Sequence, residues 1–292
     1  MHNIYIHIGF PKNASTMLET FFFPYIENVH YMGKVYNGGL TFPNAELESV
    51  FENIEKQESL YFDLEKSKDI VNKYLEKIES HEKILISSEG FTTGHVDRGV
   101  IAQRLKQIFP QAKILIIVRE QLSSLISMYA YLVGQNGLSV NLAYGRPSVK
   151  SFKEWVLEQE DYLECSYLQK LKYSKLIDAY SALFPKVNVL LYEELCAHPE
   201  NFCRGVCEFL DLGEDYYRYT ELLKNKENAR PSGLRLAFGR LLKNKVIKKI
   251  KFDWVLVKIR SITPQSIKQN NTILLKNNYQ FKVSPNRWTE NR

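Results

Sequence analysis

The chain opens, at residues 4–23, with the stretch IYIHIGFPKNASTMLETFFF, and this stretch decides the fold. Its first five residues alternate Ile with Tyr and His, a pattern rich in β-branched and aromatic side chains that predicts a buried strand. Gly9 and Pro11 then interrupt the pattern, and helix formers dominate from Ala14 to Pro24. The sequence therefore predicts a strand, a tight turn and a helix.

The predicted turn has the features of an anion site. The first backbone N–H groups of a helix lack intrahelical partners, and the positive end of the helix dipole lies beside them. Lys12 adds a full charge at this point, and Ser15 and Thr16 add hydroxyls. A phosphate-bearing ligand would suit this turn, although an ordinary strand–turn–helix opening with a surface lysine has the same pattern.

The P-loop of nucleoside triphosphatases reads GxxxxGK[ST], with the Lys directly before the hydroxyl that holds Mg²⁺. Here Lys12 precedes Ser15 by three residues, and Pro11 rather than Gly stands before it. This spacing disfavours a nucleotide kinase that uses ATP and Mg²⁺, which stays open as the alternative enzyme class.

Length and composition predict one large α/β domain over residues 1–292, with a nucleotide-binding core at 1–212 and a helical, basic part at 213–292. We find no apolar run of about 18 residues and no basic segment before the first strand, so neither a membrane span nor a signal peptide is expected. Four cysteines without C-x-x-C spacing fit a reducing cytoplasm, and the net charge of +6 favours anionic ligands.

Apolar runs predict further strands at 83–87, 113–118 and 186–192, and helical spacing predicts helices at 63–80, 97–109, 119–131, 151–158, 167–183 and 199–210. Residues 24–62 read as an irregular connection or as a segment that faces the substrate. The alternation predicts a P-loop-like central parallel sheet flanked by helices, with ligands at the carboxyl ends of its strands. Four residues fall at those ends: Lys12, Glu89, Arg119 and Tyr192.

Arg119 predicts a second phosphate site on the middle strand. Its guanidinium can hold a phosphate by two parallel hydrogen bonds, and Ser127 lies about two helical turns further on. A P-loop kinase would instead need an Asp at a strand end to manage Mg²⁺. The two sites together indicate a doubly phosphorylated nucleotide bound without a metal.

Three stretches of the chain resemble the sulfotransferases that use 3′-phosphoadenosine 5′-phosphosulfate (PAPS). They are GFPKNAST at residues 9–16, VR at 118–119 with Ser127 and Tyr129 after it, and LYEEL at 191–195 followed by HP at 198–199 and CEFL at 207–210. They follow the family's order over most of residues 3–212. The chain departs from the family where Ala14 replaces the usual Gly and Glu120 the usual Pro.

The resemblance implies a role for each matching residue. The 5′-phosphosulfate would lie in the first turn, which consists of Pro11, Lys12, Asn13, Ala14, Ser15 and Thr16. Lys12 would contact the bridging oxygen and the sulfuryl group. Arg119 and Ser127 would bind the 3′-phosphate, and Tyr192 would lie near the adenine.

A late Arg-Lys-Gly motif of the small-molecule branch is missing from the sequence. The loop at residues 228–232 could serve instead, with Arg230 near the nucleotide, or it could be a plain helix entry.

Two residues are candidates for the base that takes the proton from the acceptor hydroxyl. Glu89 follows a strand and resembles the base of carbohydrate-modifying sulfotransferases, which implies a carbohydrate acceptor. His95 is the second candidate, because the small-molecule branch uses a His after the corresponding strand. A capping or salt-bridging role for Glu89 and a solvated loop position for His95 are the alternatives.

Between residues 235 and 260 the chain has nine Lys or Arg residues and one acidic residue. This stretch is interpreted either as a patch for an anionic polysaccharide or a membrane surface, or as a solvated basic face on core helices. We expect a hydroxyl-bearing acceptor as the partner and no nucleic acid, and the sequence makes no prediction of oligomeric state. A non-catalytic module that binds nucleotide or anionic glycan is the alternative outside the enzymes.

Overall fold

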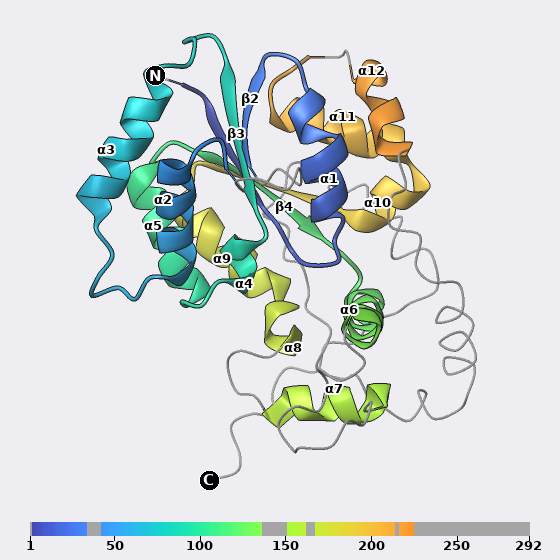
Figure 1. The fold of residues 1–292 in the computed structure, drawn as a ribbon. Helices are drawn as coiled ribbons and strands as arrows, with labels where there is room; N and C mark the ends of the chain where they lie inside the picture. The colour runs from blue at the N-terminus through green and yellow to red at the C-terminus, as the bar shows by residue number, and fades with distance from the viewer. Residues whose placement is uncertain (1, 34–41, 136–150, 162–166, 214–215, 225–292) are drawn as a thin grey trace. The chain divides into compact units, whose positions relative to one another are not determined.

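The structure is a computed structural model that describes residues 2–33, 42–135, 151–161, 167–213 and 216–224 (Figure 1). Five strands form one parallel sheet in the order β2-β3-β1-β4-β5. They are β1 (Ile4–Ile8), β2 (Val29–Gly33), β3 (Lys83–Ser88), β4 (Lys113–Val118) and β5 (Lys186–Leu191). The predicted parallel sheet and its four predicted strands are confirmed.

The helices confirm most of the predicted helical stretches. Their bounds are α1 Ser15–Phe21, α2 Ala45–Lys56, α3 Leu64–Leu75, α4 Gly90–Thr93, α5 Arg98–Ile108, α6 Gln121–Gln135, α7 Phe152–Asp161, α8 Tyr167–Lys170, α9 Tyr173–Leu183, α10 Tyr192–Ala197, α11 Pro199–Phe209 and α12 Tyr217–Thr220. The stretch predicted as one helix at 167–183 is two helices, α8 and α9. Tyr192 begins α10 instead of ending the strand.

Sequence reasoning missed β2 and α2, which both lie in the stretch read as irregular. β2 is a short edge strand, and its sequence VHYMG has no clear alternation. The helix α2 did leave a signal, because Leu47, Val50 and Ile54 are buried at helical spacing. Asn44 caps it by accepting a hydrogen bond from the amide of Leu47 at 2.9 Å.

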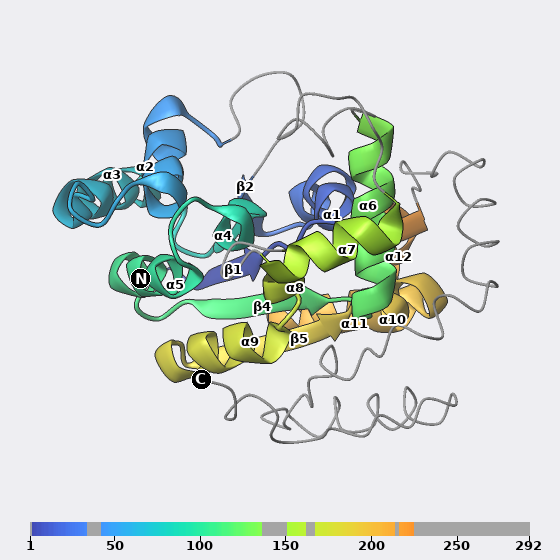
Figure 2. The same ribbon diagram turned by 90° about the horizontal axis from the view of Figure 1, so that it is seen from below.

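Helices cover both faces of the sheet (Figures 1 and 2), with α2, α5 and α9 on one side and α1 and α11 on the other. The second face has a core in which Tyr5, Leu85 and Leu115 meet apolar side chains of α1 and α11. Ile6 and Ile8, one residue out of phase in β1, point to the opposite face and are also fully buried. Burial on both faces explains why the central strands are almost continuously apolar.

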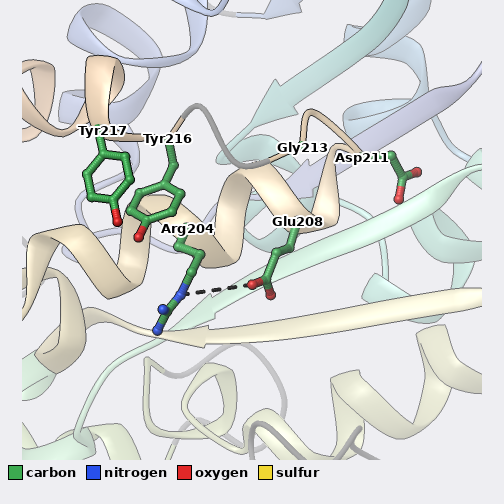
Figure 3. Close-up of a pocket in the computed structure, with 6 residues that line it drawn as sticks. All are labelled: Arg204, Glu208, Asp211, Gly213, Tyr216 and Tyr217. Carbon is green, nitrogen blue, oxygen red and sulfur yellow. Dashed lines mark ion pairs between the residues drawn. The ribbon is translucent and has the colours of Figure 1, made fainter.

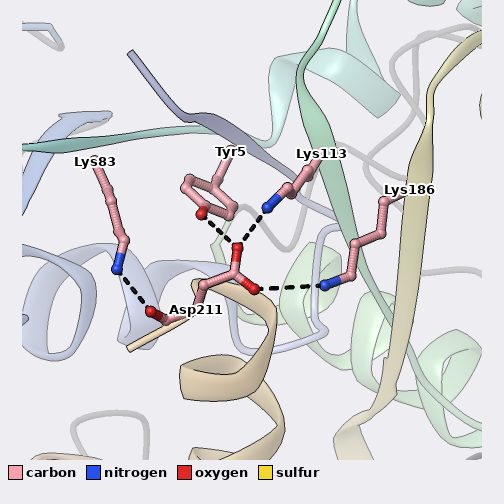
Figure 4. A network of polar contacts seen from close by, with 5 residues as sticks. All are labelled: Tyr5, Lys83, Lys113, Lys186 and Asp211. Atoms are coloured by element: carbon pink, nitrogen blue, oxygen red, sulfur yellow. Dashed lines mark hydrogen bonds and ion pairs between the residues drawn. The ribbon is translucent and has the colours of Figure 1, made fainter. Parts of the chain in front are cut away.

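At the amino-terminal edge of the sheet, Asp211 ties together the beginnings of several strands (Figure 4). Its carboxylate accepts a hydrogen bond of 2.8 Å from the Tyr5 hydroxyl and pairs with the ammonium groups of Lys113 and Lys186. Its main-chain carbonyl accepts from Lys83 at 2.7 Å. Partial burial alone would raise its pKa, but the hydrogen bonds from Lys113 and Tyr5 lower the pKa of Asp211 below its ordinary value.

The chain divides into two compact units, residues 1–128 with 175–227 and residues 129–174 with 228–292. The first unit contains the whole sheet. In the second unit, the rings of Tyr129 and Phe152 lie 5.5 Å apart and those of Tyr129 and Trp155 lie 5.7 Å apart, which makes a small aromatic core. The single-domain expectation stays a prediction, and the basic stretch at 235–260 lies outside the described residues.

Along the part of the chain that the structure describes, no helix is both long and apolar enough to cross a bilayer.

Candidate functional site

The candidate site lies at the carboxyl edge of the sheet, where neighbouring strands end at the same level. Ile8 of β1 pairs with Ser88 of β3, and Val118 of β4 pairs with Leu191 of β5. The residues that follow these strand ends are Gly9, Glu89, Arg119 and Tyr192. The fold therefore brings the strand-end residues of the prediction to one edge of one sheet.

The first turn has an unusual backbone. Lys12 and Ala14 both have left-handed φ angles, 69° and 68°, with Asn13 between them. Non-glycine residues seldom adopt this conformation, and strained residues of this kind gather at functional sites. Turns with left-handed residues can direct backbone N–H groups into a concave anion site.

Hydrogen bonds to the neighbouring strand and within the turn hold this backbone in place. The Asn13 side-chain amide donates to the carbonyl of Ile117 in β4 at 2.9 Å, and Asn13 is fully buried. The carbonyl of Phe10 accepts from the Asn13 amide at 3.2 Å and from the Ser15 hydroxyl at 3.0 Å. The shape of the turn is thus set by the fold before any ligand arrives.

Arg119 lies against this turn and is only 7% exposed. Its Nη1 donates to the main-chain carbonyl of Lys12 at 2.7 Å. Its Nε and Nη2 donate to the Ser123 hydroxyl at 3.0 and 2.7 Å, and the guanidinium lies 4.2 Å from the centre of the Tyr192 ring. The structure therefore brings Lys12, Arg119 and Tyr192 together.

The hydroxyl that contacts Arg119 belongs to Ser123, which sequence reasoning did not select. Ser123 is four residues after Arg119, and that spacing places it one helical turn away. The predicted Ser127 is buried on α6, one turn further along.

Glu120 caps α6 at the position where the family usually has Pro. Its carboxylate accepts hydrogen bonds from the amides of Leu122 and Ser123 at 3.0 and 2.6 Å. Its own amide donates to the Glu193 carboxylate at 3.0 Å. Because a side-chain cap satisfies the helix start, the helix that follows Arg119 is preserved without the proline.

Glu89 is partly buried and immediately precedes α4. The Gly9 amide donates to the carbonyl of Ser88 at 3.1 Å, and the Thr92 hydroxyl donates to the carbonyl of Gly9 at 2.6 Å. A Cβ atom at Gly9 would lie 3.0 Å from the amide nitrogen of Glu89. The glycine thus lets the backbone that follows β1 approach Glu89 closely.

His95 is exposed, and its amide donates to the carbonyl of Glu55 at 2.9 Å. Glu55 was not among the predicted residues. It lies in the last turn of α2 and is 8% exposed, and its carboxylate accepts a hydrogen bond from Ser88 at 2.6 Å. Glu55 can be recognised as part of this region only from the tertiary structure, which places α2 against the loop.

A buried polar chain lies on the same face as α1. The Ser87 hydroxyl donates to the carboxylate of Glu19 at 2.7 Å and lies 2.8 Å from Nδ1 of His7. All three side chains are fully buried. Burial lowers the pKa of His7 to about 3, so its ring is neutral at physiological pH. The chain ties α1, whose first turn belongs to the site, to β1 and β3.

A pocket of about 520 Å³ lies elsewhere, near the amino-terminal edge of the sheet (Figure 3). Its lining comprises Arg204, Glu208, Asp211, Gly213, Tyr216 and Tyr217. None of the predicted site residues is among them. The candidate site is therefore defined by the strand ends and not by this cavity.

Within the described residues, no three His, Cys, Asp or Glu side chains gather in a way that could hold a metal ion. The predicted role of Arg230 lies outside the described residues.

The family model described as "Sulfotransferase family" matches residues 11–215, which is more than half of the chain. The crystal structure of a sulfotransferase from Alicyclobacillus acidocaldarius is similar with a TM-score of 0.51 and 19% identity, over 82% of this chain and 91% of that one. At that identity, the likeness shows a shared fold.

The crystal structure of the mouse sulfotransferase SULT7A1 complexed with PAP is less similar, with a TM-score of 0.43 and 13% identity over 94% of this chain and 82% of that one. No curated protein matches the sequence.

Proposed function

The chain belongs to the sulfotransferase family, and on that premise we propose that it moves the sulfuryl group of PAPS to a hydroxyl of a carbohydrate. The observation that carries this proposal is the hydrogen bond of 2.7 Å from Arg119 to the carbonyl of Lys12. A donor with phosphates at both its 3′ and 5′ positions needs two anion sites a few ångströms apart. The turn at Lys12 and the guanidinium of Arg119 suit that need.

The first turn would hold the 5′-phosphosulfate. The amides of Ser15 and Thr16 and the Thr16 hydroxyl lie at the start of α1, where helical N–H groups lack intrahelical partners. The Ser15 hydroxyl donates to the Phe10 carbonyl and so supports the turn. Lys12 would neutralise the charge that develops on the departing phosphate. Groups that are already in place for a charge-spread transition state do most of the work in transfers of this kind.

Arg119 would hold the 3′-phosphate. Ser123 keeps its guanidinium oriented, and Ser127 would add a second hydroxyl on the same helix. Tyr192 already stacks on Arg119 and would extend that surface toward the adenine.

Glu89 would act as the base. The acceptor oxygen forms its new bond to sulfur while the bond from sulfur to the 5′-phosphate oxygen breaks, and Glu89 takes the hydroxyl proton. The products are a sulfate ester and 3′-phosphoadenosine 5′-phosphate (PAP). The side chain of His95 makes no hydrogen bond or ion pair within the described residues, so Glu89 is preferred.

The donor is tested by calorimetric titration of the full chain with PAP and, separately, with ATP and Mg²⁺. Tight binding of PAP is expected. Binding of ATP with Mg²⁺ alone would instead support the kinase alternative.

The acceptor is tested by a sulfate-transfer assay with PAPS and a panel of neutral and anionic glycans. Sulfation of at least one glycan is expected. PAP binding without transfer to any acceptor would point to a nucleotide-binding module that has lost turnover.

The basic stretch at 235–260 would bind an anionic glycan or a membrane surface. Co-sedimentation with anionic liposomes at low and physiological salt separates these two partners. Absence of binding at both salt concentrations would remove the membrane surface as a partner.

A further inference from the structure

Glu55 is a buried acidic residue that the proposed reaction does not use. It is the last but one residue of α2, and its side chain reaches under the loop that carries Glu89. Its Oε1 accepts a hydrogen bond of 2.6 Å from the Ser88 hydroxyl, which in turn accepts one of 3.0 Å from the Gly90 amide. Ser88, which precedes Glu89, therefore bonds directly to Glu55. Gly90, which follows Glu89, is linked to Glu55 through Ser88.

The space for a side chain at Gly90 is filled by the Glu55 carboxylate. A Cβ atom built at Gly90 would overlap the carboxylate carbon and both of its oxygens. The carboxylate is the end of a flexible side chain, but moving it aside would break its hydrogen bond to Ser88. The Glu55 carboxylate thus fits against Gly90 only because residue 90 has no side chain.

The backbone of Glu55 holds the far end of the same loop. Its carbonyl accepts hydrogen bonds from the amides of His95 and Val96 at 2.9 and 3.4 Å. A Cβ atom at Gly94 would overlap that carbonyl oxygen. One residue of α2 therefore fixes both ends of the segment 88–96.

Stability alone does not account for a carboxylate at this position. Burying an acidic group is costly unless hydrogen bonds compensate for its lost hydration, and an apolar side chain of similar size would often be at least as stable. The hydrogen bonds described above join Glu55 to the loop of the proposed base, which indicates that its role concerns that loop.

We propose that Glu55 is a positioning residue, which holds Glu89 at the correct distance from the acceptor hydroxyl through Ser88 and Gly90. The proposal rests on the proposed function, in which Glu89 is the base. Glu55 itself is not expected to touch the donor or the acceptor. A displacement of a reacting group by about 1 Å can lower the rate by about 10²-fold.

The test measures the rate at which PAP is released from PAPS, with the best glycan of the panel or with water as acceptor. That rate is divided by the number of PAP-binding sites found by calorimetry. The variants are Glu55→Gln, Glu55→Ala, Ser88→Ala and Gly90→Ala. Glu52→Gln is the matched control, because Glu52 is an exposed acid on the same helix that pairs only with Lys56 among the described contacts. Because protein that fails to fold does not bind PAP, this division gives the rate per folded molecule.

The expected result is a fall in kcat of roughly 10-fold for Glu55→Gln and about 10²-fold for Glu55→Ala, with the Kd for PAP within about 2-fold of wild type. Ser88→Ala should also lower kcat, and Glu52→Gln should not. Gly90→Ala should lower kcat strongly in the wild-type background and much less in the Glu55→Ala background, because the overlap is then removed.

Two results would overturn the proposal while leaving the function intact. One is wild-type kcat in Glu55→Ala when Glu89→Gln is inactive. The other is an equal effect of Gly90→Ala with and without Glu55. A wild-type protein that neither binds PAP nor transfers sulfate would reject the proposed function, and this proposal would fall with it.

Discussion

The guanidinium of Arg119, at the end of β4, donates a hydrogen bond of 2.7 Å to the main-chain carbonyl of Lys12, in the turn after β1. The two residues are 107 positions apart in sequence. Because β1 and β4 are parallel neighbours, their exits meet, and each exit contributes one cation. This single contact joins the two proposed phosphate sites.

Replacement of Arg119 by Ala should weaken PAP binding by roughly 10- to 10²-fold, because hydrogen bonds to a charged phosphate would be lost. Arg119→Lys should restore little of this, since an ammonium cannot reproduce the forked geometry. Titration calorimetry with PAP measures both. Lys68→Ala, which removes a partly exposed lysine of α3, is the control and should bind like wild type. Unchanged affinity in Arg119→Ala would argue against the 3′-phosphate role.

Glu89→Gln should lower the rate of sulfate transfer by about 10²- to 10⁴-fold, because an amide cannot take the acceptor proton. The affinity for PAP should stay at the wild-type value. His95→Ala should transfer sulfate at close to the wild-type rate, since His95 is exposed. The reverse outcome, an active Glu89→Gln and an inactive His95→Ala, would exchange the two roles.

Ala14→Gly should leave the free energy of unfolding within about 0.5 kcal/mol of wild type, or above it. A left-handed conformation costs an L residue roughly 1 kcal/mol, and the relief of that strain offsets the greater chain entropy of glycine. Ala102→Gly, in the middle of α5, is the matched comparison and should lose about 1 kcal/mol or more. Urea unfolding measures both. Equal losses in the two variants would mean that Ala14 is not strained.

His7 should make the protein less stable as the pH falls below about 6.5. In the unfolded chain this histidine binds a proton near its ordinary pKa, whereas burial lowers the pKa of His7 to about 3 in the folded protein. Between these values the unfolded state holds more protons, so acid favours unfolding. From pH 7 to pH 5 the loss should be about 2 kcal/mol.

Urea unfolding of the wild type and of His7→Phe at pH 7 and pH 5 tests this origin. The phenylalanine fills the ring volume but cannot be protonated, so its stability should change less over this range. His81→Gln, which alters an exposed histidine, is the control and should keep the wild-type dependence. If His7→Phe and the wild type lost the same stability between pH 7 and pH 5, the titrating group would be a residue other than His7.

The strands of the core could be predicted because each is an apolar run whose composition reflects burial on two faces. The run at 113–118 matches β4 residue for residue. β2 escaped prediction because it is a short edge strand, and such strands carry little periodicity. α2 escaped prediction because frequent aromatic and turn residues nearby obscured the spacing of Leu47, Val50 and Ile54.

The candidate site was predictable only as far as individual strand ends. Lys12, Glu89 and Arg119 stand out because each follows an apolar run. Ser123 and Glu55 did not stand out, because a serine on a helix and a glutamate in an acidic helix are common. What distinguishes them is their contact with a distant residue, which local patterns do not contain.

The sequence by itself determined the parallel sheet, the order of its main strands along the chain and the residues that follow each strand, because hydrophobic periodicity is a local property. Only the tertiary structure decided the spatial order β2-β3-β1-β4-β5, and with it which exits are neighbours. It also placed the carboxylate of Glu55 in the space that Gly90 leaves open. Both depend on packing between segments far apart in the chain, where shape and hydrogen bonding act over a few ångströms.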